Sequence, residues 1–139
     1  MNKPRSSNNK KPKESAKGIT AISIRGYKSL YDECRLEIRP LTILAGANSS
    51  GKSSAMQPLL LLKQTLEASY DPGALLLNDP NVRLTSVDQL LSMVAGKRTN
   101  EEFMIRLEID DRRYLANTFK KHPKKHIELA KMEYYDGNI

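Results

Sequence analysis

The chain has 139 residues, 39% of them hydrophobic, and a formal net charge of +7 at neutral pH. That length suits one modest domain, and no apolar run approaches the roughly 20 residues that a membrane-spanning helix needs. A single cysteine, Cys34, excludes an internal disulfide. Together with a polar N-terminus that shows no apolar signal region, it predicts a cytoplasmic protein.

Most of the positive charge lies at the start of the chain. Residues 1–17 hold six lysine or arginine residues and one glutamate, so they account for +5 of the net charge, and the rest is nearly balanced. The segment has no apolar periodicity and is rich in lysine, asparagine and serine, which predicts a disordered basic tail. The alternative is a basic arm that contacts nucleic acid.

Two short segments before residue 40 predict an antiparallel pair of strands. Residues 19–25 end in alternating apolar and polar side chains, Gly26 breaks the pattern, and residues 34–39 alternate again. Cys34 lies on the apolar face of the second segment. We therefore interpret it as a half-buried strand residue rather than a nucleophile.

The most informative motif is G-x-x-x-x-G-K-S, the phosphate-binding loop, at residues 46–53. Its glycines let successive backbone N–H groups converge on phosphate oxygens, and Lys52 is expected to reach the β- and γ-phosphates of a nucleotide. The Ser53 hydroxyl is the expected Mg²⁺ ligand, and the following helix directs its N-terminal N–H groups at the anion. The predicted nucleotide-binding residues are Gly46, Ala47, Asn48, Ser49, Ser50, Gly51, Lys52, Ser53 and Ser54.

The segments on both sides of the motif favour this interpretation. Residues 41–45 are a short apolar run typical of a buried parallel strand, and residues 54–69 predict a helix that Pro58 bends. Four consecutive leucines in this helix imply burial on more than one side. The alternative is a glycine- and serine-rich loop that contains a lysine by chance.

The second half of the chain predicts a short helix and two strands. Residues 86–94 have a serine cap and an apolar face, and residues 103–110 alternate strictly, as in an edge strand or a strand with one exposed face. A Walker B strand would be a continuous apolar run that ends in an acid. Asp110 and Asp111 are therefore interpreted as turn residues rather than magnesium ligands. Residues 127–135 fit a further strand.

His122 and His126 have the i, i+4 spacing that places two metal ligands on one face of a helix. Pro123 lies between them, four lysines surround them, and the sequence places no acidic partner with them. These features argue against a metal site, and the role of both histidines stays open.

Residues 19–30 and 41–54 together resemble the N-terminus of the ABC-class ATPases of the AAA family. The group includes RecF, the structural-maintenance-of-chromosomes (SMC) proteins and the overcoming-lysogenisation-defect (OLD) nucleases. Residues 57–64 are most similar to uncharacterised bacterial ATPases of the OLD-like branch. The resemblance covers residues 18–110 and rests mainly on the phosphate loop and the two strands before it.

The resemblance implies an α/β fold of the P-loop NTPase type, in which antiparallel strands flank a parallel core strand. It also implies ATP and Mg²⁺ as cofactors, a head-to-head homodimer or a partner subunit, no membrane, and a role on DNA or in phage defence. Lys28 matches a basic residue near the phosphates in some relatives, and Ser49 stands where many have glycine. The residues that match the phosphate and magnesium site are Asn48, Gly51, Lys52 and Ser53.

Three features of that group are missing from the sequence: the LSGG-type signature, the Walker B strand with its catalytic acid, and the switch histidine. We therefore expect residues 18–139 to be the N-terminal portion of an incomplete ATPase domain, belonging to a longer or a split protein. ATP binding with little hydrolysis is the expected activity of the isolated chain, and no catalytic residue is assigned.

Two other functions fit parts of the sequence. A nucleic-acid-binding module would use residues 1–17 and 120–125, although the sequence has few aromatic residues for base stacking. An interaction subunit would present its exposed leucines to a partner that completes the fold. A GTPase is disfavoured because no Asn-Lys-x-Asp motif is present.

Overall fold

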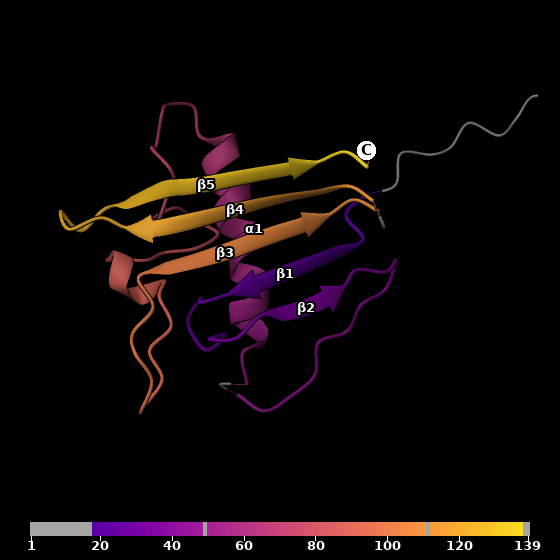
Figure 1. Cartoon of the computed structure of the whole chain (residues 1–139), viewed down its shortest axis with the longest axis horizontal. Helices are drawn as coiled ribbons and strands as arrows, with labels where there is room; N and C mark the ends of the chain where they lie inside the picture. The colour runs from indigo at the N-terminus through magenta and orange to yellow at the C-terminus, as the bar shows by residue number, and fades with distance from the viewer. Residues whose placement is uncertain (1–17, 49, 111, 138–139) are drawn as a thin grey trace, which may run out of the picture.

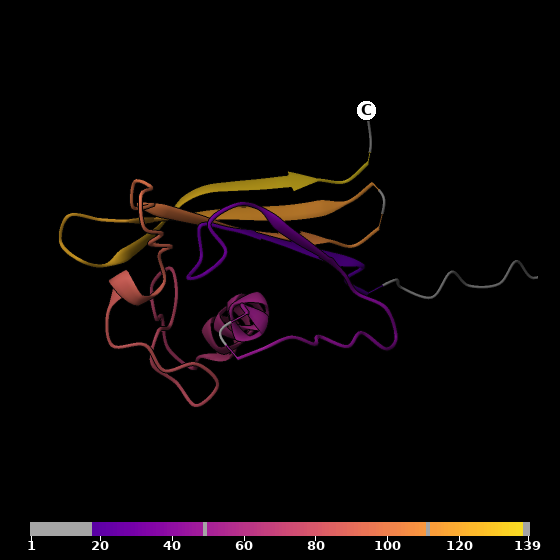
Figure 2. The same cartoon turned by 90° about the horizontal axis from the view of Figure 1, so that it is seen from below.

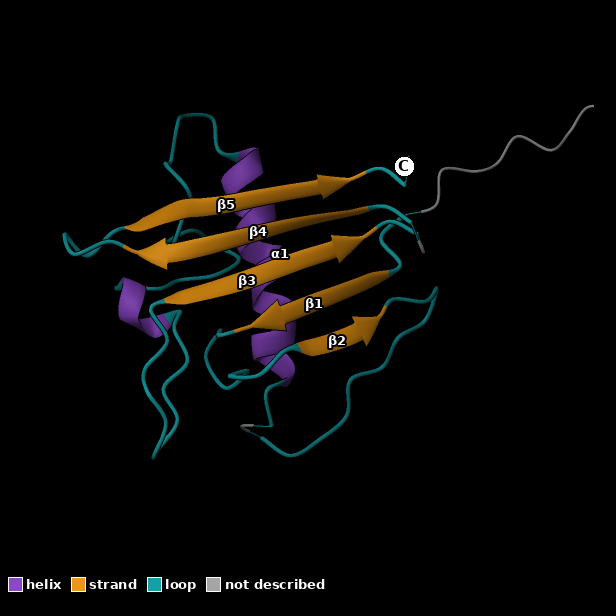
Figure 3. Cartoon of the chain, in the orientation of Figure 1, coloured by secondary structure: helices purple, strands orange, loops and turns teal. Residues whose placement is uncertain are grey.

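The computed structural model describes residues 18–48, 50–110 and 112–137, which form an antiparallel sheet with one long helix on one face (Figures 1 and 2). The predicted basic tail and two single positions, Ser49 and Asp111, lie outside the described residues. Figure 3 shows the elements by type. In chain order they are β1 (Ala21–Arg25), β2 (Cys34–Glu37), α1 (Lys52–Glu67), the 3₁₀ helix η1 (Val87–Gln89), β3 (Glu102–Glu108), β4 (Tyr114–Lys121) and β5 (Ile127–Tyr135).

The five strands lie in the order β2-β1-β3-β4-β5, and every neighbouring pair is antiparallel. The predicted pairing of the first two segments is confirmed, with Ile24 of β1 opposite Cys34 of β2. The strands predicted at residues 103–110 and 127–135 are also confirmed. However, β3 is an internal strand between β1 and β4, so its polar side chains mark an exposed face rather than an edge.

The hydrophobic core lies between the sheet and α1. Phe103 of β3 stacks on Phe119 of β4 with ring centroids 5.1 Å apart, and Tyr27 meets Phe103 edge-on at 5.6 Å. Burying side chains of this size stabilises the fold by about 1.5–3 kcal/mol each. The other buried members of this cluster are Ile22, Ile24, Leu61, Leu75, Val82, Leu84, Val87, Leu90, Leu91, Ile105 and Ile127.

The predicted buried parallel strand at residues 41–45 is wrong. The segment has no strand structure, and the side chains of Leu41 and Ile43 are 77% and 76% exposed. A parallel strand is buried when neighbours pair with it and helices cover it. All five described strands pair only with one another, so residues 41–45 have no partner. The α/β character is present, but the parallel core strand is not formed.

Helix α1 begins at Lys52, two residues before the predicted start, and contains the buried Pro58. The sheet covers one side of it: Leu61 is fully buried, whereas Leu66 is 84% exposed. Leu59, Leu60 and Leu62 are partly buried against the core, and the segment after α1 covers Gln64, so the expected burial on more than one side is met in part. None of the helices in the described part of the chain is long and apolar enough to cross a membrane.

Only three of the residues predicted to be helical at 86–94 form a helix, and these make up η1. The reason is that the backbone after η1 bonds to the turn that follows β1. The N–H of Lys28 donates to the carbonyl of Leu90 at 2.9 Å, and the N–H of Ser92 donates to the carbonyl of Gly26 at 2.8 Å. These bonds hold residues 90–92 beside the turn and prevent a continuous helix.

Asp110 acts as a turn residue, as predicted. Its Oδ1 atom accepts the backbone N–H groups of Arg112 and Arg113 at 2.9 and 2.8 Å, and its Oδ2 atom accepts the Arg113 side chain at 2.8 Å. These bonds lower the pKa of the Asp110 carboxyl, the bond from the Arg112 backbone first among them. The hydrogen bonds of this carboxylate therefore lie within the β3–β4 turn.

Glu108→Gln is expected to lower the free energy of unfolding by about 1 kcal/mol near neutral pH. Arg35 donates to both carboxylate oxygens at 2.6 and 3.1 Å, and these bonds lower the pKa of Glu108, whose side chain is 13% exposed. Because the folded pKa lies below the unfolded one, the stabilisation is present above about pH 4.5 and is lost as pH falls through the folded value. Urea unfolding of the wild type and Glu108→Gln at a series of pH values should show that the difference in their free energies of unfolding disappears as pH falls. A difference that stays constant with pH would contradict this account.

Candidate functional site

The loop at residues 46–53 closes directly on the N-terminus of α1, and two glycines make its path possible. Gly51 caps the helix in the left-handed region with φ 90°, and Gly46 has φ 154°. A Cβ atom on Gly46 would lie 2.7 Å from Ser50 Oγ, and one on Gly51 would lie 3.1 Å from Ser29 Oγ. Backbone conformation therefore favours glycine at both positions, and a Cβ atom would in addition require the neighbouring serine side chains to move.

Lys52, the first residue of α1, stabilises the loop by hydrogen bonds to its backbone. Its Nζ atom donates to the carbonyl oxygens of Gly46 and Ala47 at 2.5 and 2.7 Å. The N–H of Ser50 donates to the carbonyl of Ala47 at 3.2 Å, which tightens the turn. The first bond of the helix runs from the N–H of Ala55 to the carbonyl of Gly51. The N–H groups before it therefore have no partner within the helix.

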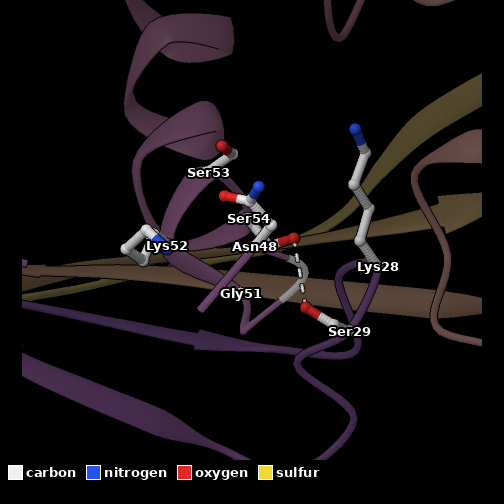
Figure 4. Close-up of a pocket in the computed structure, with 7 residues that line it drawn as sticks. All are labelled: Lys28, Ser29, Asn48, Gly51, Lys52, Ser53 and Ser54. Atoms are coloured by element: carbon white, nitrogen blue, oxygen red, sulfur yellow. Dashed lines mark hydrogen bonds between the residues drawn. The ribbon is translucent and has the colours of Figure 1, made fainter. Parts of the chain in front are cut away.

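The turn after β1 forms the opposite wall of the site (Figure 4). Ser29 Oγ donates to Ser54 Oγ at 3.2 Å, which joins this turn to the first turn of α1. Lys28 has a left-handed backbone with φ 47°, and its Nζ atom donates to Gln57 Oε1 at 2.6 Å. The Tyr27 hydroxyl donates to the same oxygen at 3.1 Å. Gln57 thus holds the Lys28 ammonium at the rim of the site.

A cavity of about 330 Å³ lies between the two walls, and its charge favours an anion. Among the residues that the structure describes, no acidic side chain lines it, while two lysines and the positive end of the helix do. Burial lowers the pKa of Lys28 and raises that of the Tyr27 phenol, which therefore stays neutral as a hydrogen-bond donor. The lining residues are Lys28, Ser29, Asn48, Gly51, Lys52, Ser53 and Ser54.

The structure brings most of the predicted residues to one place, in two groups. Five of them line the cavity, with Ser53 exposed at its mouth, whereas Gly46, Ala47 and Ser50 form the part of the loop that Lys52 contacts. The sequence reasoning missed Ser29 and Gln57. No pattern in the sequence links either of them to the loop, because the contact depends on how the turn after β1 packs on α1.

A glycine loop that ends in a lysine at the start of a helix is the defining feature of the P-loop class of nucleotide-binding domains. The chain belongs to the AAA ATPase domain family, whose model matches residues 18–137. The match spans the whole described sheet, the loop and α1, and it confirms the predicted class of AAA-type ATPase. None of the curated proteins compared with the chain matches it.

Proposed function

We propose that this chain binds ATP with Mg²⁺ through residues 46–54. The observation that supports this most is the cavity at the start of α1. Two lysines line it, no described acid lines it, and Gly46 and Gly51 of its loop have positive φ values that favour glycine. A triphosphate is the ligand class that such a positive, N–H-rich site accommodates. Membership of the AAA ATPase domain family supports the same ligand.

Each side chain at the site has a role in this proposal. Lys52 exchanges its bonds to the Gly46 and Ala47 carbonyls for phosphate oxygens, and the Ser53 hydroxyl becomes a Mg²⁺ ligand. Lys28, held by Gln57, faces the phosphates from the other wall. Mg²⁺ held by Ser53 would supply positive charge beside the phosphate oxygens. The loop and the N–H groups at the start of α1 would position the phosphates.

Magnesium dependence tests the assignment of Ser53. A fluorescent ATP analogue should bind the wild-type chain about tenfold more tightly with Mg²⁺ than with a chelator, and Ser53→Ala should lose most of that difference. Ser69→Ala is the matched control, because Ser69 is exposed beyond the end of α1. Equal Mg²⁺ dependence in Ser53→Ala and Ser69→Ala would show that Ser53 is not a ligand.

We further propose that the isolated chain hydrolyses ATP slowly. Phosphoryl transfer needs a group that orients the attacking water, and no carboxylate or imidazole lines the described cavity. A phosphate-release assay with Mg-ATP checks this proposal. Turnover at the rates of complete ATPases would contradict it and would point to a catalytic group elsewhere in the chain.

The branch of the family and the biological role are proposed from the resemblance to the RecF, SMC and OLD-like proteins. We propose an incomplete ATPase domain of the OLD-like branch that pairs with a second copy around the nucleotides and acts on DNA or in phage defence. The exposed side chains of Leu41, Ile43 and Leu66 support the proposal of a partner, because they leave apolar surface that it could cover. Light scattering with and without Mg-ATP tests the pairing, and salt-dependent DNA binding that is lost without residues 1–17 tests the contact with DNA.

A further inference from the structure

The β4–β5 hairpin ends in a tight loop at His122-Pro123-Lys124-Lys125-His126. The N–H of Lys125 donates to the carbonyl of His122 at 2.9 Å, and the N–H of His122 donates to the carbonyl of His126 at 2.9 Å. Lys125 has a left-handed backbone with φ 60°. This is the three-residue hairpin loop in which a turn is followed by a left-handed residue. Pro123 occupies the second position of the turn, where its fixed φ is favourable.

This loop places the two histidines opposite each other. Their rings stack with centroids 4.3 Å apart and an interplanar angle of 22°. Side chains two residues apart on a strand share a face, so Glu128 of β5 lies on the same side as His126. As a result, one ring nitrogen of each histidine and one carboxylate oxygen of Glu128 lie within 4.8 Å of one another.

We propose that His122, His126 and Glu128 form a site for a divalent transition-metal ion of the Zn²⁺ type. Two imidazoles and a carboxylate are an established zinc ligand set that leaves one position for water, with metal–ligand distances of about 2.0–2.2 Å. The three atoms now lie within 4.8 Å of one another, and the side chains would rotate to direct them at one ion. The acidic partner is Glu128, two residues after His126, which the hairpin brings beside both histidines.

The state of His122 suits this role. Its Nδ1 atom accepts the backbone N–H of Lys124 at 3.2 Å, so this nitrogen carries a lone pair, which is the form of imidazole that binds a metal. The bond is exposed, and a metal ion bound at Nδ1 would replace it. Imidazole ligands select zinc, nickel and copper, whereas Mg²⁺ and Ca²⁺ require oxygen ligands. The site is therefore distinct in metal preference from Ser53.

The positive charges of nearby lysines repel a metal ion and lower the affinity of the site for it. Lys121 is already paired with Asp88, and Lys120 lies opposite Glu128 in the strand register. Lys124 and Lys125 extend from the exposed loop, where solvent and salt screen their charge. Binding requires that the free energy of the metal–ligand bonds exceed the remaining repulsion from these lysines. The hairpin loop lies at the end of the sheet near η1, away from the start of α1 (Figure 1).

The test is a Zn²⁺ titration of the untagged full chain without nucleotide, read by competition with a chromophoric chelator. One ion per chain is expected, and His126→Ala and Glu128→Gln should each weaken binding by at least about tenfold. Co²⁺ in place of Zn²⁺ should give the visible absorption of a four-coordinate ion in the wild type and lose it in both variants. Circular dichroism verifies that the variants are folded.

Two control variants separate this site from other metal binding. Glu133→Gln removes an exposed carboxylate elsewhere on β5, and Cys34→Ser removes the single thiol; both should bind Zn²⁺ like the wild type. The proposal is overturned if Zn²⁺ does not bind, or if His126→Ala and Glu128→Gln bind it as tightly as Glu133→Gln. Loss of binding in Cys34→Ser would equally overturn it. None of these outcomes depends on ATP binding.

Discussion

Replacing Lys52 with alanine is expected to weaken Mg-ATP binding by about a hundredfold. Its ammonium group already lies within the loop, bonded to the carbonyls of Gly46 and Ala47. Charge-assisted bonds to phosphate are worth about 1.5–3 kcal/mol, which corresponds to roughly one to two orders of magnitude in affinity. Isothermal titration calorimetry of both proteins measures the difference directly.

Lys63→Ala is the matched control for this experiment. Lys63 lies on an exposed part of the same helix and pairs with Glu67 at 2.6 Å, so its loss changes net charge and helix surface but not the loop. Affinity for Mg-ATP should be nearly unchanged in this variant. Equal losses in the two variants would mean that overall charge, rather than Lys52, governs nucleotide binding.

Gln64→Leu is expected to destabilise the fold by about 3 kcal/mol, although leucine is similar in size and more apolar. The buried Gln64 donates from Nε2 to the carbonyls of Leu76 and Val82 at 2.6 and 3.1 Å, and its Oε1 atom accepts the N–H of Val82 at 2.9 Å. Leucine leaves the Val82 N–H and the Leu76 carbonyl without these bonds, whereas the Val82 carbonyl keeps the N–H of Asp79 at 3.1 Å. Each unpaired buried group costs about 1–3 kcal/mol. Urea unfolding followed by circular dichroism measures the loss.

The control for Gln64 is Gln89→Leu. Gln89 is exposed and accepts the backbone N–H of Thr85 at 2.8 Å, a bond that water can replace. Its loss should cost no more than about 0.5 kcal/mol. If Gln64→Leu were as mild as Gln89→Leu, the segment between α1 and η1 would not depend on the contacts of Gln64.

Elements whose side-chain pattern matches their environment could be predicted from the sequence. The alternation in residues 103–110 identified β3 because one face of the sheet is solvated. The G-x-x-x-x-G-K-S motif located the loop and the start of α1 because Gly46 and Gly51 adopt backbone conformations that favour glycine.

The errors occur where the structure of a segment depends on a distant partner. Residues 41–45 have the composition of a buried strand but no neighbour to pair with, and residues 90–92 bond to the turn after β1 instead of continuing a helix. No element was assigned around His122 and His126, whose interval spans a hairpin loop. Local sequence cannot distinguish these cases, because the deciding contacts are long-range.

The most direct test of the nucleotide site is thermal melting of the wild-type chain with and without Mg-ATP. A ligand that binds only the native state raises the melting temperature, and at a concentration of about 100 times Kd it adds roughly 2.7 kcal/mol of stability. We expect a cooperative transition that moves to higher temperature as Mg-ATP is added. A cooperative transition whose midpoint does not change at millimolar Mg-ATP would contradict the proposal that residues 46–54 bind ATP.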